Sequence, residues 1–310
     1  MRAVGIKEFG GPEVLRVIDL PDPEAGPGEV RVRVHAAAVN PADAFVRSGS
    51  WRDFWGPRPD LVVPGLDFAG VIDQVGDGVG WTLGAEVMGV VVPPRGAYAE
   101  YQVVPANAVV RIPAGTSLAQ AATLPMNGLT ARIALDLLAL QPGQILAVPG
   151  AAGVLGGYTI GLAKQAGLVV IADAKPQDEQ RVRNAGADIV VPRTDDFAAR
   201  VREIVSTGAD GLVDAANLQR PALNAVRDGG RFAASRQPTF ETERDITLFE
   251  FTVRDYLPGG YRLDDLRVLA EEKKLNLDVA AIYPMDQATL AHQHLDQGGI
   301  RGRLILEFAS

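Results

Sequence analysis

A glycine-rich turn between an apolar run and a helix-like segment constrains the fold of this chain more than any other feature. Residues 145–148 (Ile-Leu-Ala-Val) predict a short buried strand, and glycines follow at positions 150, 153 and 156. Glycine lets the backbone turn tightly and approach phosphates, while the next helix offers unpaired N–H groups and the positive end of its dipole. The pattern indicates a site for a dinucleotide pyrophosphate; the alternative is a tight turn without a ligand. The predicted contacts are Gly150, Ala151, Gly153, Val154, Leu155 and Gly156.

The next apolar run supports this interpretation. Residues 168–172 predict a second buried strand that ends at Asp173, 20 positions after the central glycine (173 − 153 = 20). A carboxylate at about this interval can accept hydrogen bonds from the adenosine ribose. Asp173 would repel the 2′-phosphate of NADPH, whereas Lys175 would attract it. Repulsion between this carboxylate and the phosphate dianion costs more free energy than attraction to one flexible, hydrated ammonium recovers. The sequence therefore favours NADH slightly.

Strand and helix patterns alternate through this part of the chain. This alternation is typical of a doubly wound parallel sheet, the Rossmann arrangement, with helices on both faces. The expected strands are 145–149, 168–172, 188–191, 211–215 and 230–234, and the expected helices are about 155–166, 177–185, 196–206 and 219–227.

The first 113 residues have a different texture, with short β-branched runs cut by turns. Residues 30–35 alternate with period two, which is typical of a half-buried strand in a mainly antiparallel domain. The strand-rich texture returns near the end, at 278–283 and 303–308. We therefore expect an α/β protein whose antiparallel β domain (1–118 and 259–310) is split around a parallel-sheet domain (119–258).

Composition excludes several classes of function. The net charge of −8 and the absence of a basic block argue against a nucleic-acid partner. The chain has no cysteine, which excludes disulfides, thiolate nucleophiles and Cys-ligated zinc. No segment approaches the roughly 18 apolar residues of a membrane span, and the first residues lack the apolar block of a signal peptide, so no membrane partner and a cytoplasmic location are expected.

Several short motifs occur in a fixed order along almost the whole chain. They are Ala38–Asp43, Arg47–Gly49, Val63–Gly70, Gly96–Tyr101, Ala122–Ala131, the glycine loop, Asn184–Asp188, Gly229–Phe232 and Gly302–Leu306. Their order and spacing resemble those of the medium-chain dehydrogenase/reductases, in the zinc-independent quinone oxidoreductase branch. The resemblance implies a GroES-like catalytic domain split around a Rossmann domain, a homodimer, and hydride transfer from NADH or NADPH.

The zinc ligands of other members of that family are missing. Zinc-dependent relatives place a Cys where Asn40 stands and a His-Glu pair near Leu66-Asp67. The three histidines are isolated: His35 lies in a strand pattern, and His292 and His294, two positions apart, point to different helix faces. Without a strong Lewis acid, we expect reduction of a quinone or a conjugated enone or enoyl group rather than alcohol oxidation.

The resemblance also implies catalytic candidates. Asn40 and Asp43 flank a proline and are expected to line the nicotinamide end of the site, with Asn40 donating to the acceptor oxygen; alternatively both cap their own backbone. Enoyl-reducing relatives often carry a proton-donating tyrosine where this chain has Trp51. An indole N–H donates a hydrogen bond but no proton, so the proton is expected from water or solvent.

Other candidates surround these. Trp51, Phe54 and Trp55 form either stacking walls for a flat substrate or loop anchors. The resemblance also implies that Asn127 and Thr130, at the start of a helix, lie near the nicotinamide, with Thr130 the stronger candidate; the alternative is a hydroxyl bonded to the backbone.

Two further residues flank the predicted sheet. Asn217 follows the strand 211–215 and is either a cofactor contact or a helix cap. Tyr158 either reaches the substrate pocket or packs against the sheet.

Two other functions remain open at this point. One is a reductive cyclase or tailoring enzyme of specialised metabolism, in which hydride attack triggers carbon–carbon bond formation. The other is a non-catalytic dinucleotide sensor that binds the cofactor without turnover.

Overall fold

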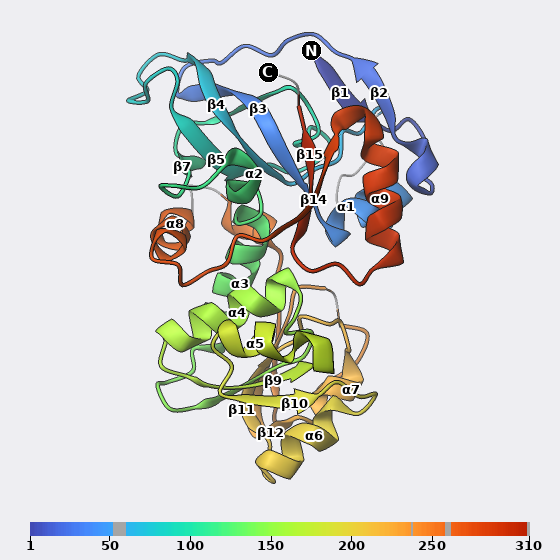
Figure 1. Ribbon diagram of the computed structural model, residues 1–310, viewed down its shortest axis with the longest axis vertical. Coiled ribbons are helices and arrows are strands. Elements are labelled where there is room, and N and C mark those ends of the chain that lie inside the picture. Colours follow the sequence, from blue (N-terminus) through green and yellow to red (C-terminus); the bar gives the residue numbers. More distant parts are fainter. Residues whose placement is uncertain (52–59, 237, 258–261, 309–310) are drawn as a thin grey trace. The chain divides into compact units, whose positions relative to one another are not determined.

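The computed structural model describes residues 1–51, 60–236, 238–257 and 262–308, which form two compact units (Figure 1). The first unit comprises 1–126, 257–271 and 277–310, and the second comprises 127–256 and 272–276. The predicted fold class, an antiparallel β domain split around a parallel-sheet domain, is confirmed. The chain first passes from the first unit to the second between residues 126 and 127, inside helix α3 (Pro125–Leu138). The sequence predicts this boundary eight residues earlier, at 118/119.

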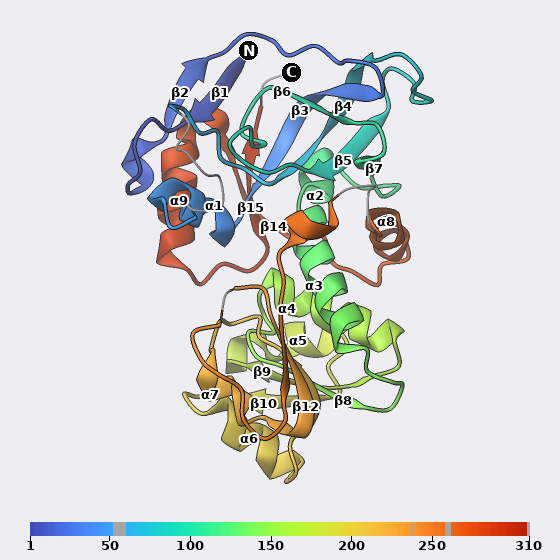
Figure 2. The same ribbon diagram turned by 180° about the vertical axis from the view of Figure 1, so that it is seen from behind.

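The first unit is built on a seven-stranded sheet (Figure 2). Its order is β14-β15-β3-β4-β5-β7, and β6 also pairs with β3. All pairs are antiparallel except β14 with β15. The elements are β1 (Arg2–Gly5), β2 (Arg16–Asp19), β3 (Glu29–Val39), α1 (Pro41–Ser48), β4 (Asp67–Val75), β5 (Glu86–Val90), β6 (Tyr101–Pro105), β7 (Val109–Arg111), α2 (Leu118–Ala121), α8 (Leu263–Glu271), β14 (Val279–Pro284), α9 (Ala288–Gln297) and β15 (Arg303–Glu307).

Strand β3 organises this sheet. Val30, Val32 and Val34 are buried and alternate with half-buried residues, as the period-two pattern predicts. The strand continues to Val39, beyond the predicted run, because its last residues pair with both β15 and β4. Those residues are buried on both faces, so they lack the alternation that marks a half-exposed strand.

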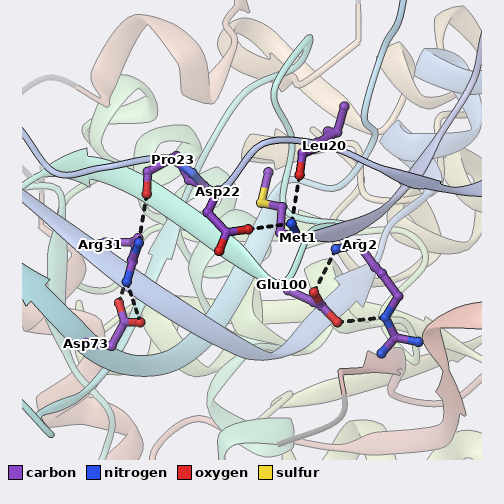
Figure 3. A network of polar contacts seen from close by, with 8 residues as sticks. All are labelled: Met1, Arg2, Leu20, Asp22, Pro23, Arg31, Asp73 and Glu100. Atoms are coloured by element: carbon purple, nitrogen blue, oxygen red, sulfur yellow. Dashed lines mark hydrogen bonds and ion pairs between the residues drawn. The ribbon is translucent and has the colours of Figure 1, made fainter.

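Polar contacts bind the N-terminal segment to this sheet (Figure 3). The Arg2 guanidinium donates to Glu100 at 2.9 Å, next to the start of β6. The Arg31 guanidinium donates to both carboxylate oxygens of Asp73, at 3.0 and 3.1 Å, and to the carbonyl oxygen of Pro23. These contacts hold the β1–β2 pair and the segment that follows it against β3, β4 and β6.

The second unit contains a six-stranded parallel sheet of order β10-β9-β8-β11-β12-β13. The order reverses direction at β8 and β11, and ligands bind outside the carboxyl ends of strands at such a switch point. The elements are β8 (Ile145–Val148), α4 (Val154–Gln165), β9 (Val169–Ala174), α5 (Glu179–Asn184), β10 (Ile189–Pro192), α6 (Phe197–Ile204), β11 (Ala209–Val213), α7 (Arg220–Leu223), β12 (Val226–Ala234) and β13 (Thr247–Glu250).

One predicted helix of this unit is wrong in its second half. The helix expected over 219–227 ends at Leu223, and β12 already begins at Val226. Val226 pairs with Ala209 of β11 ahead of a register shift, so tertiary pairing overrides the local helical pattern.

Among the described residues, no helix is both long and apolar enough to cross a membrane.

Candidate functional site

The glycine loop of the second unit lies between β8 and α4. Gly150 has φ +76°, a left-handed conformation that favours glycine. Gly153 is the N-cap of α4 and supplies no side-chain hydrogen bond to the first turn. The N–H groups at this helix end are therefore not capped by the residue that precedes them, and the helix dipole favours an anion there.

The spacing of the loop depends on its third glycine. A Cβ on Gly156 would lie 2.5 Å from the carbonyl oxygen of Gly150 and 2.6 Å from Cα of Ala151. A Cβ on Gly153 would meet only the Gly150 oxygen, at 3.3 Å. The loop is thus folded tightly on α4 at Gly156 and less tightly at Gly153, a conformation that fits close approach of a pyrophosphate to the backbone.

Asp173 is connected to this loop directly. Its carboxylate accepts hydrogen bonds from the backbone N–H groups of Gly150 at 2.7 Å and Ala151 at 3.3 Å, and the residue is only 4% exposed. It therefore holds the loop through its backbone. Its contact with the adenosine ribose stays a prediction. Lys175, two residues later, is exposed.

Arg193 is a residue of this region that sequence reasoning missed. It follows β10, and its Nε lies 3.8 Å from Oδ2 of Asp173. The carboxyl ends of adjacent parallel strands lie at one sheet edge, so the first basic residue after the predicted strand 188–191 was the available signal. A cation therefore stands next to the carboxylate on which the predicted cofactor preference depends.

The loop after β11 lies against the glycine loop at the switch point. A Cβ on Gly150 would be 3.0 Å from the carbonyl of Ala215. Asp214 accepts the backbone N–H groups of Leu218 and Gln219 at 2.9 and 2.8 Å. Its carboxylate thus fixes the path of this loop beside the predicted pyrophosphate site.

Asn217 lies in that loop. It has φ +55°, and its side-chain oxygen accepts a hydrogen bond from Gln219 at 2.8 Å. Gln219, not Asn217, precedes α7 as its N-cap, so the alternative role of helix cap does not apply to Asn217.

Arg236, which the sequence analysis also missed, follows β12 at the same sheet edge. Arg236 is exposed overall, but partial desolvation lowers the pKa of its guanidinium, and the nearby Asp214 carboxylate opposes that shift. The signal for it was its position two residues after the end of a predicted strand.

Tyr158, on α4, is only 2% exposed and lies inside the second unit.

In the first unit, Asn40 is held by two buried carboxylates. Its side-chain amide donates to Oδ2 of Asp67 at 2.6 Å, and its backbone N–H donates to Oδ2 of Asp43 at 2.8 Å. Asn40 is the N-cap of α1, and Asp43 closes a capping box from three positions later. Asp43 therefore does cap the backbone at the start of α1, which is the alternative role that the sequence leaves open for it.

Both carboxylates are fully buried. Asp43 also accepts the backbone N–H of Gly65 at 3.2 Å and the Tyr98 hydroxyl at 3.1 Å, and Asp67 accepts the backbone N–H of Met126. Burial raises the pKa of Asp43 and of Asp67 to about 7, and the hydrogen bonds that they accept oppose this rise. Asn40 is thus placed by groups that titrate near neutral pH.

The predicted aromatic wall is described only in part. Trp51 stacks on Phe45 of α1 with ring centroids 5.9 Å apart and packs against the hydrophobic core of the first unit. Phe54 and Trp55 lie outside the described residues.

The remaining candidates lie on α3. Asn127 and Thr130 occupy its first half and are 7% and 6% exposed. Within the part of the chain that the structure describes, no three His, Cys, Asp or Glu side chains are grouped so that they could hold a metal ion.

Comparison with known proteins gives two family matches. Residues 26–114 match a family described as "Alcohol dehydrogenase GroES-like domain", and residues 185–306 match one described as "Zinc-binding dehydrogenase". The first match covers most of the seven-stranded sheet, and the second covers the later strands of the parallel sheet and the return to the first unit.

Relatives align over nearly the whole chain. Quinone oxidoreductase from Sus scrofa is 27% identical and aligns over 99% of this chain and 97% of its own length; 2-haloacrylate reductase from Burkholderia sp is 27% identical, with 98% of each covered. The structure of an NAD-dependent alcohol dehydrogenase is similar at 32% identity and a TM-score of 0.86, with full coverage of both chains. A mycobacterial protein complexed with NADPH is similar at 27% identity and a TM-score of 0.86, covering 99% and 100%.

Proposed function

This chain belongs to the medium-chain dehydrogenase/reductase family, in its quinone oxidoreductase-like branch, and on that premise we propose that it is an NAD(P)H-dependent oxidoreductase whose hydride acceptor is a quinone or a conjugated enone or enoyl group. The single observation that carries the proposal is the fit of the glycine loop to a pyrophosphate, with Gly156 folded on Gly150 and the start of α4 uncapped by Gly153. When bound, the reduced nicotinamide supplies the hydride.

The second unit holds the cofactor in this proposal. The backbone N–H groups of Val154 and Leu155 bind the pyrophosphate at the dipole end of α4, and Asp173 binds the adenosine ribose. Thr130, Asn127 and Asn217 contact the nicotinamide side. Arg236 adds positive charge at the same sheet edge, which favours the anionic cofactor.

The choice of acceptor rests on the chemistry available in the first unit. The positions that bind zinc in related dehydrogenases carry Asn40, Leu66 and Asp67, which lack the nitrogen and sulfur ligands that zinc prefers. The side-chain amide of Asn40 has two N–H groups, and while one donates to Asp67 the amide can also donate to the acceptor oxygen and so stabilise the negative charge that develops there. The proton that completes the reduction comes from water or solvent, because Trp51 carries no transferable proton.

We propose a preference for NADH. The Asp173 carboxylate is held close to the loop by two backbone N–H groups, so it cannot move away from a 2′-phosphate without releasing them. Arg193 and Lys175 offset this repulsion only in part, because Lys175 is exposed and the Arg193 side chain is 42% exposed, so solvent screens both charges. The relatives point both ways, since one is described as NAD-dependent and another is complexed with NADPH.

The test has two stages. Fluorescence titration of the purified protein with NADH and with NADPH measures the Kd of each cofactor. We expect saturable binding of both, with a lower Kd for NADH. Cofactor oxidation is then followed with a panel of quinones, enones and enoyl thioesters. Binding without consumption of cofactor would favour a sensor, consumption with one specific polyene alone would favour a tailoring enzyme, and no binding of either cofactor would refute the proposal.

A homodimer stays a prediction. Within the described residues, β13 ends the parallel sheet and pairs on one side only, with β12. Light scattering after size-exclusion chromatography measures the oligomeric state directly.

A further inference from the structure

Helix α9 carries two histidines that each meet a tyrosine, but in different surroundings. His292 lies 3.1 Å from the Tyr98 hydroxyl through Nε2, and both residues are fully buried. His294 lies 2.9 Å from the Tyr283 hydroxyl through Nδ1, in a half-buried position. The rings meet edge to face in both pairs, with centroids 5.8 and 6.3 Å apart. Of the two pairs, His292–Tyr98 is the one linked to a buried carboxylate, because the Tyr98 hydroxyl also donates to Asp43.

The hydrogen bonds of the buried pair all point in one direction. Nη1 of Arg47 lies 3.2 Å from Nδ1 of His292, and a guanidinium can only donate. Nδ1 is therefore the acceptor, and the proton of the neutral imidazole is on Nε2. That N–H donates to the Tyr98 oxygen, so the Tyr98 hydroxyl donates its own proton to Asp43. The order of donation is Arg47 to His292 to Tyr98 to Asp43.

A carboxylate satisfies the end of this chain of donors better than a neutral carboxyl group does. A protonated Asp43 would present a second proton toward the Tyr98 oxygen, and one O–H or N–H group of the chain would lose its acceptor. An unpaired donor in a fully buried position is expensive. The chain of donors therefore favours the charged form of Asp43, in opposition to its burial.

The charged and titratable groups around the chain are few. Tyr98, Asp67 and Arg303 act on Asp43, with Asp67 opposing its charged form and Arg303 favouring it. Burial and the adjacent Arg47 lower the pKa of His292 to about 3, so the imidazole stays neutral across the pH range of interest. Arg47 is itself oriented by Asp296, 2.9 Å away on α9.

We propose that His292 and Tyr98 are positioning residues for Asn40: they keep Asp43 in the carboxylate form that binds the backbone N–H of Asn40 and of Gly65. Asn40 is the N-cap of α1 and Gly65 lies two residues before β4, so one carboxylate fixes two loops of the first unit. Figures 1 and 2 show α9 and α1 side by side, which is how a residue from the end of the chain reaches a helix near its start. The catalytic consequence rests on the proposed function, because it requires Asn40 to act on the acceptor.

The primary test follows Asn40 itself rather than turnover. In ¹⁵N-labelled protein, the backbone amide signal of Asn40 is recorded against pH for the wild type, Tyr98→Phe and Tyr283→Phe. Loss of the Tyr98 hydroxyl removes a hydrogen bond to the charged form of Asp43, so we expect the midpoint in Tyr98→Phe to rise by roughly one pH unit. Tyr283→Phe removes the matching hydroxyl from the half-buried pair and should leave the midpoint unchanged. An unshifted midpoint in Tyr98→Phe would overturn the proposal.

Variants of His292 keep the proposal testable if Tyr98→Phe does not fold. His292→Gln retains an amide that can accept from Arg47 and donate to Tyr98, whereas His292→Leu can do neither. We expect the Asn40 midpoint to rise in His292→Leu and to return toward the wild-type value in His292→Gln. Equal midpoints in the two variants would contradict a positioning role.

Turnover separates failure of this inference from failure of the proposed function. If the wild type oxidises NADH with a quinone or enone, Tyr98→Phe should lower kcat roughly tenfold below the shifted midpoint while the KM for the cofactor stays close to that of the wild type. A shifted Asn40 midpoint with unchanged kcat would keep the positioning role and refute the action of Asn40 on the acceptor. A wild type without turnover would refute the proposed function and leave the amide titration as the test of positioning.

Discussion

A side-chain carbon on Gly156 would lie 2.5 Å from the carbonyl oxygen of Gly150, a distance that no side chain can accommodate without movement of the backbone. We therefore predict that Gly156→Ala separates the loop from α4. The expected loss of stability is about 1–3 kcal/mol, typical of overpacking, with a rise in Kd for NADH of at least roughly tenfold. Thermal unfolding and fluorescence titration measure the two effects.

Gly157 supplies the matched control for this substitution. It is the next residue of α4, and a Cβ there would meet no atom within 4 Å. Gly157→Ala should bind cofactor as the wild type does and gain about 0.5–1 kcal/mol, because alanine is the better helix former. Equal cofactor affinity in both alanine variants would contradict the predicted loop.

Asp173 combines two roles, and Asp173→Asn separates them. The asparagine oxygen can still accept a hydrogen bond from the Gly150 N–H, but the negative charge is gone. We predict nearly unchanged melting and a shift of the Kd ratio toward NADPH by roughly tenfold. Asp195→Ser, which removes an exposed charge after β10, should not move the ratio. An unchanged ratio in Asp173→Asn would refute Asp173 as the determinant of cofactor preference.

His292 makes stability depend on pH in a defined direction. Its folded-state pKa of about 3 is below the ordinary 6.5, so its stabilising contribution is complete above pH 6.5 and is lost as the pH falls toward 3. We expect His292→Gln to be less stable than the wild type at pH 7, and the difference to narrow by about 2 kcal/mol at pH 5. Glutamine is chosen because it keeps the hydrogen bonds that set the Asp43 midpoint, so the pH dependence of Asp43 and Asp67 largely cancels in the comparison.

Denaturant unfolding at pH 5, 6 and 7 measures that difference. The matched substitution is His294→Gln, two residues away on the same helix, where the side chain is half-buried. A difference between His292→Gln and the wild type that is constant with pH would show that the buried imidazole is not held neutral.

Asn40 is the residue on which turnover depends in the proposed mechanism. We predict that Asn40→Ala lowers kcat by roughly 10²-fold, the usual cost of removing a donor to a developing oxyanion. The Kd for cofactor should change little, because the glycine loop belongs to the second unit. Stopped-flow oxidation of NADH measures the first quantity and fluorescence titration the second. Ser48→Ala, an exposed change at the end of α1, is the control.

The alternating half of the chain could be predicted closely from local patterns. The strand 145–148, the start of α4 and the end of β9 all fall within two residues of their expected bounds, because period, glycine spacing and apolar runs are local properties. The helix expected over 219–227 shows the limit. Its second half forms β12 because Val226 finds a partner in β11, which no local pattern records.

The residues of the candidate site likewise fall into those that spacing along the chain predicted and those that it did not. Glycines 150, 153 and 156 and Asp173 were predicted from spacing, because a pyrophosphate loop is built from consecutive residues. Arg193 and Arg236 were missed, because Arg193 approaches Asp173, and Arg236 comes under the electrostatic influence of Asp214, only when parallel strands align at one sheet edge.

The sequence by itself determined the alternation of strands and helices from residue 145 to residue 234, the glycine loop, and the absence of cysteine and of histidine–glutamate zinc ligands. Only the tertiary structure decided the surroundings of Asn40. Arg47 and His292 are 245 positions apart, and His292 and Tyr98 are 194 apart, so no periodicity links them. They meet because burial of charged and polar side chains is tolerated only when each finds a hydrogen-bond partner, and the folded core supplies those partners from distant segments.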